Sequence, residues 1–206
     1  MQIRFLYFDL GNVLLNFDHE IACRQTAELT GLSPQRVRQI IFGDKLEDRY
    51  ERGDITTREF YEIFCEQSGT RPELNALTLA CSKIFNLNVP VVPIVAHLRA
   101  AGYRLGILSN TCEAHWEYVF DGRYRLLRDF FDVYALSYKI RVMKPNRKIY
   151  DDAAEMAGVP INEIFFVDDR GDNVAGALAA GMDAVRFVSA SQLAADLRQR
   201  GLQFNY

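Results

Sequence analysis

The chain has 206 residues, 49% of them apolar, and a formal net charge of -3 at pH 7. This size and composition favour one domain, or one domain with an insertion, that buries roughly 70% of its unfolded surface. The negative charge and the absence of any block of lysine and arginine argue against nucleic acid as the main partner.

The lack of targeting signals and the spacing of the cysteines indicate the cellular compartment of the protein. No apolar run is long enough to span a bilayer, and the first apolar segment is too short for a signal peptide, so a cytoplasmic protein without a membrane partner is expected. The cysteines show neither C-x-x-C spacing nor a matched histidine pair; they are Cys23, Cys65, Cys81 and Cys112. We expect reduced thiols in the core rather than a metal site or disulfides.

The first expected element is an apolar strand over residues 5–8, which ends at Asp9 and is followed by Gly11. A strand without polar alternation is typical of a parallel sheet that is covered on both faces. Ligands collect at the C-terminal ends of such strands, and a glycine there lets the backbone turn sharply. Asp9 is therefore a candidate for chemistry, and the alternative is a carboxylate that caps a turn.

No buried strand is expected between residues 16 and 88. Residues 16–18 are expected to form a loop, with Asp18 capping a helix over residues 19–30. Glycines separate the further expected helices, which cover residues 34–42, 45–52, 57–67 and 72–85. The sequence thus predicts an all-helical insert, residues 16–88, within a core made of residues 1–15 and 89–206.

Strands and helices alternate in the rest of the chain. Strands are expected over residues 103–108, 133–137, 164–167 and 184–188. Helices are expected over residues 90–101, 112–120, 124–130, 147–157, 173–180 and 191–200. This alternation predicts an α/β fold with a Rossmann-like parallel sheet and right-handed crossovers.

Three of the expected strands end in polar residues, which are Asp9, Ser109, Asn110, Asp168 and Asp169. Because the carboxyl ends of parallel strands lie along one edge of the sheet, these residues are expected to lie together. Lys144, in a loop before a proline, can reach the same edge.

These segments resemble, in order, the four motifs of the haloacid dehalogenase superfamily. They are Asp-Leu-Gly-Asn-Val at residues 9–13, Leu-Ser-Asn-Thr at 108–111, Lys-Pro at 144–145 and Phe-Val-Asp-Asp at 166–169. The resemblance covers the whole core, and the insert resembles the helical C1-type cap of that superfamily. The opening motif, the stretch Glu51-Arg52-Gly53 and the doubled aspartate with Asn173 look like bacterial α-D-glucose-1-phosphate phosphatases. The doubled aspartate also resembles the N-terminal phosphatase domain of soluble epoxide hydrolases.

The resemblance implies a Mg²⁺-dependent phosphatase that acts on a small phosphorylated substrate, such as a sugar 1-phosphate. Asp9 would be the nucleophile and would form an aspartyl-phosphate. Asp9, the backbone carbonyl of Gly11 and Asp169 would bind Mg²⁺, supported by Asp168. The charges of these residues also favour a bound cation. Repulsion between two carboxylates at about 4 Å costs on the order of 4 kcal/mol, which a cation between them relieves. Oxygen ligands suit Mg²⁺.

The resemblance also assigns the groups that would hold the phosphate. Ser109 and the backbone N–H of Asn110 would bind its oxygens, together with Gly11 and Asn12, and Lys144 would neutralise the charge of the phosphoryl group. Asn173 stands where it can either cap the next helix or join the site.

The sequence departs from the superfamily pattern at Gly11. Most of these phosphatases carry there a second aspartate, which protonates the leaving group and then activates water; such a group supplies about 10² to 10⁴ in rate. Three accounts are open: a leaving group that departs easily, such as an anomeric oxygen; another acid, either a residue or the substrate; or lost activity. His19 is a candidate acid, and the alternative is a surface or hinge histidine.

The sequence is also compatible with two other functions, and it leaves two roles open for three residues of the insert. A 2-haloacid dehalogenase also uses an aspartate nucleophile without the second aspartate, and a phosphate-binding or partner-binding protein would have lost turnover. Arg49, Tyr50 and Arg52 are expected either to face the substrate or to form a solvated face of their helix.

Overall fold

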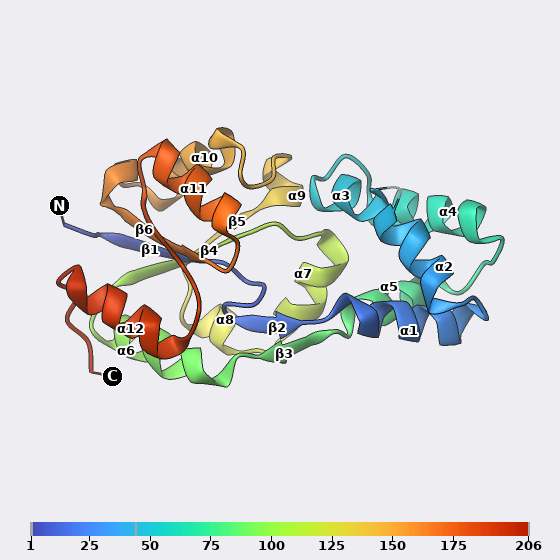
Figure 1. The fold of residues 1–206 in the computed structure, drawn as a ribbon, viewed down its shortest axis with the longest axis horizontal. Helices are drawn as coiled ribbons and strands as arrows, with labels where there is room; N and C mark the ends of the chain where they lie inside the picture. The colour runs from blue at the N-terminus through green and yellow to red at the C-terminus, as the bar shows by residue number, and fades with distance from the viewer. Residues whose placement is uncertain (1, 44, 206) are drawn as a thin grey trace.

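A computed structural model describes residues 2–43 and 45–205. Five parallel strands form one sheet in the order β5-β4-β1-β6-β7, which confirms the predicted α/β fold (Figure 1). The strands are β1 (Phe5–Phe8), β4 (Arg104–Ser109), β5 (Val133–Leu136), β6 (Ile164–Asp168) and β7 (Asp183–Arg186).

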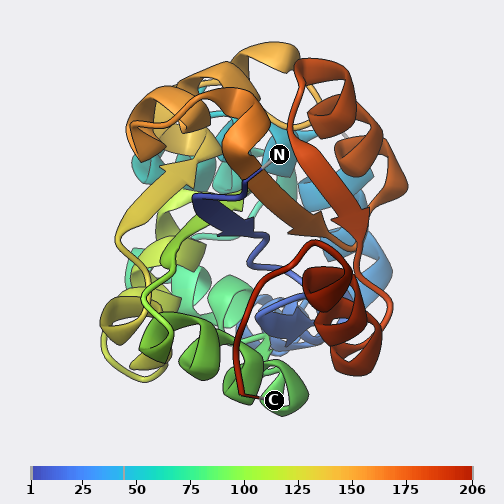
Figure 2. The ribbon, with the colours of Figure 1, turned by 90° about the vertical axis from the view of Figure 1, so that its left-hand side faces the viewer.

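Helices cover both faces of the sheet (Figures 1 and 2). Phe5 and Tyr7 pack against α10 (Arg147–Ala157) and α11 (Gly171–Ala180). Leu6 and Phe8 belong to the core on the other face, which is built from α6 (Val92–Ala100), α7 (Glu113–Phe120), α8 (Leu126–Asp129) and α12 (Ala190–Gln199). Successive strand residues point to opposite faces, so β1 is apolar at every position.

The helices between β2 and β3 in the chain lie beyond the carboxyl edge of the sheet, at the right of Figure 1. They are α1 (His19–Thr30), α2 (Pro34–Arg38), the π-helix η1 (Gln39–Gly43), α3 (Leu46–Glu51), α4 (Thr57–Ser68) and α5 (Leu74–Ser82). Asp18 caps α1 through the N–H of Glu20, as predicted, and these helices share their own apolar core. All four cysteines are buried thiols. No helix among residues 2–43 and 45–205 has the length and apolarity to cross a bilayer.

The structure corrects two secondary-structure predictions at the ends of the insert. The predicted loop at residues 16–18 is wrong, because β2 (Leu15–Phe17) pairs antiparallel with β3 (Phe85–Leu87), and the helix expected over residues 72–85 ends at Ser82. Three residues are too few to show the alternation of a strand. Short helices were also missed: η2 (Val89–Val91), α9 (Ser137–Ile140) and η3 (Ile161–Glu163).

Candidate active site

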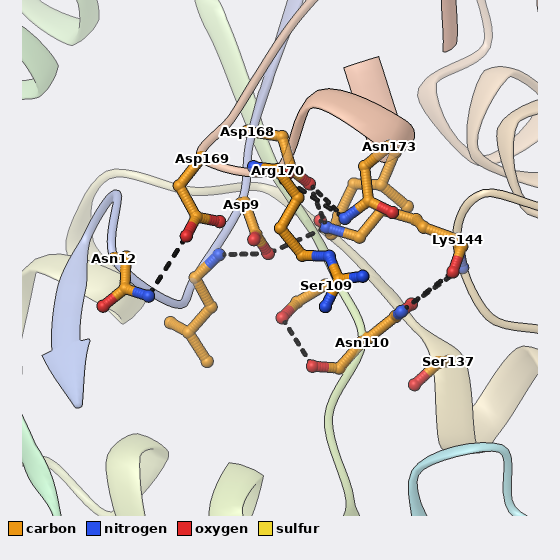
Figure 3. A network of polar contacts seen from close by, with 12 residues as sticks. Asp9, Asn12, Ser109, Asn110, Ser137, Lys144, Asp168, Asp169, Arg170 and Asn173 are labelled. Carbon is orange, nitrogen blue, oxygen red and sulfur yellow. Dashed lines mark hydrogen bonds and ion pairs between the residues drawn. The ribbon is translucent and has the colours of Figure 1, made fainter. Parts of the chain in front are cut away.

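The polar strand ends meet at the carboxyl edge of the sheet, as the sequence predicts (Figure 3). Asp9 follows β1, Ser109 ends β4 and Asp168 ends β6, and these three strands are neighbours. The loop after α9 brings Lys144 to the same place, between two of the carboxylates. Asp9 and Asp168, which are 159 positions apart in the chain, thus belong to one cluster.

Asp9 is 7% exposed, and its Oδ1 accepts a hydrogen bond from the N–H of Leu10 at 2.7 Å. The same oxygen lies 2.9 Å from Nζ of Lys144. Burial raises the pKa of Asp9 to about 7; the Lys144 ammonium opposes this rise, and the Asp168 carboxylate adds to it. A cation at the site therefore favours the charged, nucleophilic form of Asp9.

The ammonium of Lys144 is the positive centre of the cluster. It donates to Oδ2 of Asp168 at 2.6 Å and to the carbonyl of Leu108 at 2.9 Å. Burial alone lowers the pKa of Lys144, but the carboxylates of Asp9 and Asp168 outweigh it and raise the pKa above its ordinary value. Lys144 is therefore a permanent cation held between two carboxylates.

Asn110 fixes the backbone of Lys144. Its Oδ1 accepts from the Lys144 N–H at 2.8 Å, and its Nδ2 donates to the Lys144 carbonyl at 3.1 Å. Ser109 is almost fully buried, and its Oγ donates to the carbonyl of Asn110 at 3.2 Å. The side chain of Asn110 thus positions the lysine, a role that the sequence did not suggest.

Asp168 is fully buried and hydrogen-bonded on both oxygens. Nδ2 of Asn173 lies 3.0 and 3.1 Å from them, and the N–H of Arg170 donates to Oδ1 at 2.8 Å. Asn173 lies inside α11 rather than at its N-cap, so the helix-cap alternative for this residue is wrong. Asp168 and Asn173 together hold Lys144 in place.

The third carboxylate, Asp169, faces the turn after β1. Nδ2 of Asn12 donates to Oδ2 of Asp169 at 3.1 Å, and Asn12 adopts a left-handed conformation with φ of 55°. One carboxylate oxygen from each of Asp9, Asp168 and Asp169 lies within 4.8 Å of the others. Three carboxylates so close together, against one ammonium, form a suitable site for a divalent cation with oxygen ligands.

A cavity of about 940 Å³ opens above this cluster. We call its sheet side the core wall, which includes Asp9, Gly11, Asn12, Asn110, Lys144, Asp169 and Asn173. We call the opposite side the insert wall, which consists of Phe17, His19, Glu47, Asp48, Glu51 and Arg52. The cavity is thus bounded by residues from both parts of the chain, and its lining is largely polar.

Comparison with known proteins assigns the family. A sequence model of haloacid dehalogenase-like hydrolases matches residues 3–181. The chain belongs to this family. It is 38% identical over 99 residues to a glyceraldehyde 3-phosphate phosphatase of Methanopyrus kandleri, which covers 47% of this chain and 41% of that protein. It is 28% identical over 147 residues to the pyrimidine 5'-nucleotidase YjjG of Escherichia coli, over 65% of this chain and 61% of that protein.

A solved structure extends the similarity to nearly the whole hydrolase. The haloacid dehalogenase family enzyme bt-2542 of Bacteroides thetaiotaomicron, in complex with magnesium and inorganic phosphate, superposes with a TM-score of 0.81. The two chains are 27% identical, and the alignment covers 91% of this chain and 95% of that one. The chain thus spans 41% and 61% of the length of the two curated relatives, and nearly the whole length of this solved enzyme.

This haloacid dehalogenase-like hydrolase has no room for a side chain at Gly11. A Cβ atom there would lie 2.6 Å from Cε1 of Phe17, well inside contact distance. The Phe17 ring lies between the rings of His19 and Phe85, with centroids 4.9 and 5.8 Å away. An aromatic ring of β2 thus occupies the space into which an aspartate at this position would extend.

The candidate residues of the insert differ in whether they line the cavity. His19 lines the cavity with its ring stacked on Phe42 at 4.6 Å. Arg52 also lines it, but Arg49 is exposed elsewhere on α3. Tyr50 is buried; its hydroxyl lies 2.7 Å from Oγ1 of Thr57 and accepts from the N–H of Ala114. Of the three residues expected to face either substrate or solvent, only Arg52 lines the cavity.

Sequence reasoning assigned no role to the acidic residues of the insert wall, Glu47, Asp48 and Glu51. Burial raises the pKa of Glu47 well above its ordinary value, and Glu51 and Asp48 add to the rise. Glu47 and Glu51 are four residues apart and therefore lie on one face of α3. That spacing was the signal in the sequence that could have identified them.

Proposed function

We propose that this hydrolase is a Mg²⁺-dependent phosphomonoesterase that forms an aspartyl-phosphate on Asp9. The observation that carries the proposal is the ion-paired cluster of Asp9, Lys144 and Asp168, with Asp169 beside it, at the base of a polar cavity. A buried carboxylate whose charged form is favoured by an adjacent lysine is suited to attack phosphorus. The phosphatase names of the relatives and the phosphate complex of bt-2542 support the same reaction.

The metal would be held by Asp9, Asp169 and the carbonyl of Gly11. Asp168 would support the site indirectly, since Lys144 and Asn173 already occupy its oxygens. Bound Mg²⁺ would add positive charge next to the phosphate oxygens and reduce repulsion among the carboxylates. The magnesium complex of bt-2542 supports this choice of ion.

The residues of the core wall would divide the remaining work. A carboxylate oxygen of Asp9 would attack phosphorus as the bond to the leaving oxygen breaks, and water would then hydrolyse the acyl phosphate and restore Asp9. Ser109, the N–H of Asn110 and the turn at Gly11 and Asn12 would orient the phosphate. Lys144 would stabilise the negative charge of the transferred group.

We propose a small phosphorylated metabolite as substrate, and within that class a sugar phosphate such as a sugar 1-phosphate. The polar lining from His19, Asp48 and Arg52 supports a ligand rich in hydroxyl groups. Residues 1–15 and 89–206 would form the catalytic core, and residues 16–88 would form the cap that selects the substrate.

A screen of phosphate release tests the proposal. The panel contains sugar 1-phosphates, sugar 6-phosphates, glyceraldehyde 3-phosphate and pyrimidine 5'-nucleotides, each with Mg²⁺ and with EDTA. We expect release only with Mg²⁺, and fastest from a sugar phosphate. No release from any compound by the folded protein would refute the phosphatase proposal, and preference for a nucleotide would refute the sugar assignment alone.

A further inference from the structure

The core wall lacks a proton donor for the leaving group. Gly11 has no side chain, and the ring of Phe17 fills the adjacent space. Lys144 is held by two carboxylates and a carbonyl, and it keeps its proton. Release of an alkoxide from phosphorus without a proton is slow, so an acid elsewhere on the cavity would accelerate it.

We propose that Glu51 of the insert wall is the general acid and base of this hydrolase. The inference rests on the proposed phosphatase function and names the group that replaces the missing aspartate. Glu51 ends α3 and lines the same cavity as Asp9.

The backbone of Glu51 is fixed to the edge of the sheet. Its carbonyl lies 2.6 Å from Oγ of Ser137, the first residue of α9. The same Oγ accepts from the N–H of Thr111 at 2.9 Å, and Thr111 directly follows the phosphate-binding segment at the end of β4. One hydroxyl thus ties the end of α3 to the edge on which Asp9 stands.

Gly53, just after α3, allows the backbone there to approach α9 closely. It has φ of 75°, and a Cβ atom there would lie 2.2 Å from the carbonyl oxygen of Tyr138. Only glycine permits both this conformation and this approach of two backbones. The position of Glu51 on the cavity is therefore determined by backbone contacts at Glu51 itself and at Gly53.

The surroundings of Glu51 favour its protonated form. Burial raises its pKa to about 7, and the negative charges of Asp48 and Asp9 add to the rise. Lys144 and Arg170 oppose it. Glu47, Cys112 and His115 also lie close to it among residues 2–43 and 45–205. Burial raises the pKa values of Glu47 and Cys112 and lowers that of His115 to about 4, so none of the three adds positive charge at neutral pH.

His19, the acid considered from the sequence, is less suited. Burial lowers its pKa, and the guanidinium of Arg38 lowers it further, so the imidazole is neutral at pH 7. Its ring is stacked on Phe42, and its Nε2 lies 3.8 Å from Oε1 of Glu47. An aromatic wall of the cavity, rather than an acid, is the role that these contacts support.

The proton transfers balance over the two steps. As Asp9 attacks phosphorus and the bond to the leaving oxygen breaks, Glu51 gives its proton to that oxygen, and the product departs as an alcohol. The Glu51 carboxylate then takes a proton from the water that attacks phosphorus. The acyl phosphate bond breaks, phosphate leaves, and Asp9 is again a carboxylate and Glu51 again an acid.

The test compares leaving groups in Glu51→Gln. An amide cannot donate the proton, so kcat/KM for an alkyl phosphate such as a sugar 6-phosphate should fall about 10²-fold. For 4-nitrophenyl phosphate, whose leaving group needs no proton, kcat/KM should change less than about threefold. Because water activation also fails, the variant should release one 4-nitrophenol per enzyme in a burst and then turn over slowly.

The pH profile gives an independent readout. Between about pH 7 and 9 a phosphate monoester stays a dianion, so loss of activity there reports the enzyme. A general acid must be protonated, and kcat/KM of the wild type on alkyl phosphates should fall as pH rises through about 7. Glu51→Gln should lose this basic limb, and Glu51→Asp should retain it.

Two controls separate chemistry from positioning. Glu66→Gln changes an exposed glutamate of α4 and should leave all rates within twofold. Ser137→Ala removes the hydroxyl that holds the end of α3. It should lower kcat/KM by the same factor for the alkyl and the 4-nitrophenyl phosphate, and the fall in activity above about pH 7 should remain. The same pattern in Glu51→Gln, at an unchanged melting temperature, would overturn the inference. Absence of phosphate release by the wild type would instead overturn the proposed function on which it rests.

Discussion

The two walls of the cavity are built in different ways. On the core wall, Asp9, Lys144 and Asn110 are bonded to one another or to a strand, and each polar side chain has a fixed partner. On the insert wall, Glu51 is held through its carbonyl, and burial and the negative charges of Glu51 and Asp48 raise the pKa of Glu47. On the core wall the Lys144 ammonium opposes the rise that burial causes in the pKa of Asp9, whereas for Glu51 on the insert wall the negative charges of Asp48 and Asp9 add to the corresponding rise in the pKa. The difference supports the two proposals made above, that Asp9 on one wall attacks phosphorus and that Glu51 on the other transfers the proton.

The largest expected effect is at the nucleophile. Asp9→Asn keeps the shape of the side chain but cannot attack phosphorus, so phosphate release should fall about 10⁴-fold or more. Phosphate release and thermal melting of the purified variant are the measurements. Asp172→Asn, which changes an exposed carboxylate paired with Arg170, should retain activity. Near-normal turnover by Asp9→Asn would show that Asp9 is not the nucleophile.

Lys144→Met tests whether the core wall depends on its single ammonium. Two buried carboxylates would lose their counter-ion, so the free energy of unfolding should fall by about 3 to 5 kcal/mol. Urea unfolding measures this change. Lys148→Met, which breaks an exposed pair with Asp152, should cost at most about 1 kcal/mol. Equal losses in the two variants would mean that the buried pair has no special role.

Metal binding should stabilise the core wall and not the insert wall. At a concentration about 100 times its dissociation constant, Mg²⁺ adds roughly 2.7 kcal/mol, or about 5 to 10 °C in melting temperature for a chain of this size. Asp169→Asn should abolish most of this shift, and Asp172→Asn should preserve it. A full shift in Asp169→Asn would place the ion elsewhere, for example beside Glu47 and Glu51.

The smallest expected effect is at Tyr50, which supports the insert without lining the cavity. Tyr50→Phe removes a hydroxyl that bonds Thr57 and the N–H of Ala114, so unfolding should become easier by about 1 kcal/mol. The rate of phosphate release should stay within twofold. A rate loss above tenfold at an unchanged melting temperature would show that Tyr50 acts on the substrate.

The core wall could be predicted from the sequence because a parallel sheet leaves little freedom. Once β1, β4 and β6 are recognised, the residues that follow them must meet at one edge. The role of the Asn110 side chain could not be predicted, because it bonds to a backbone 34 residues away whose path depends on α9. Helix α9 itself has four residues, too few for a periodic pattern.

The insert wall could not be derived in the same way. Helix α1 was predicted from Asp18, because an N-cap is a local signal. The orientation of α3 depends instead on contacts with distant residues. Ser137 bonds to the carbonyl of Glu51, 86 residues earlier in the chain, and Gly53 packs against Tyr138. Strands β2 and β3 were missed because each is only three residues long and is defined by its partner.

The contact between Gly11 and the ring of Phe17 also constrains how this hydrolase can evolve. A single change to aspartate at residue 11 would bring the new Cβ to 2.6 Å from that ring, which His19 and Phe85 flank. A smaller residue must therefore appear at position 17 before an acidic one can be accepted at position 11. We expect the two substitutions to be epistatic, with Gly11→Asp better tolerated once residue 17 is smaller.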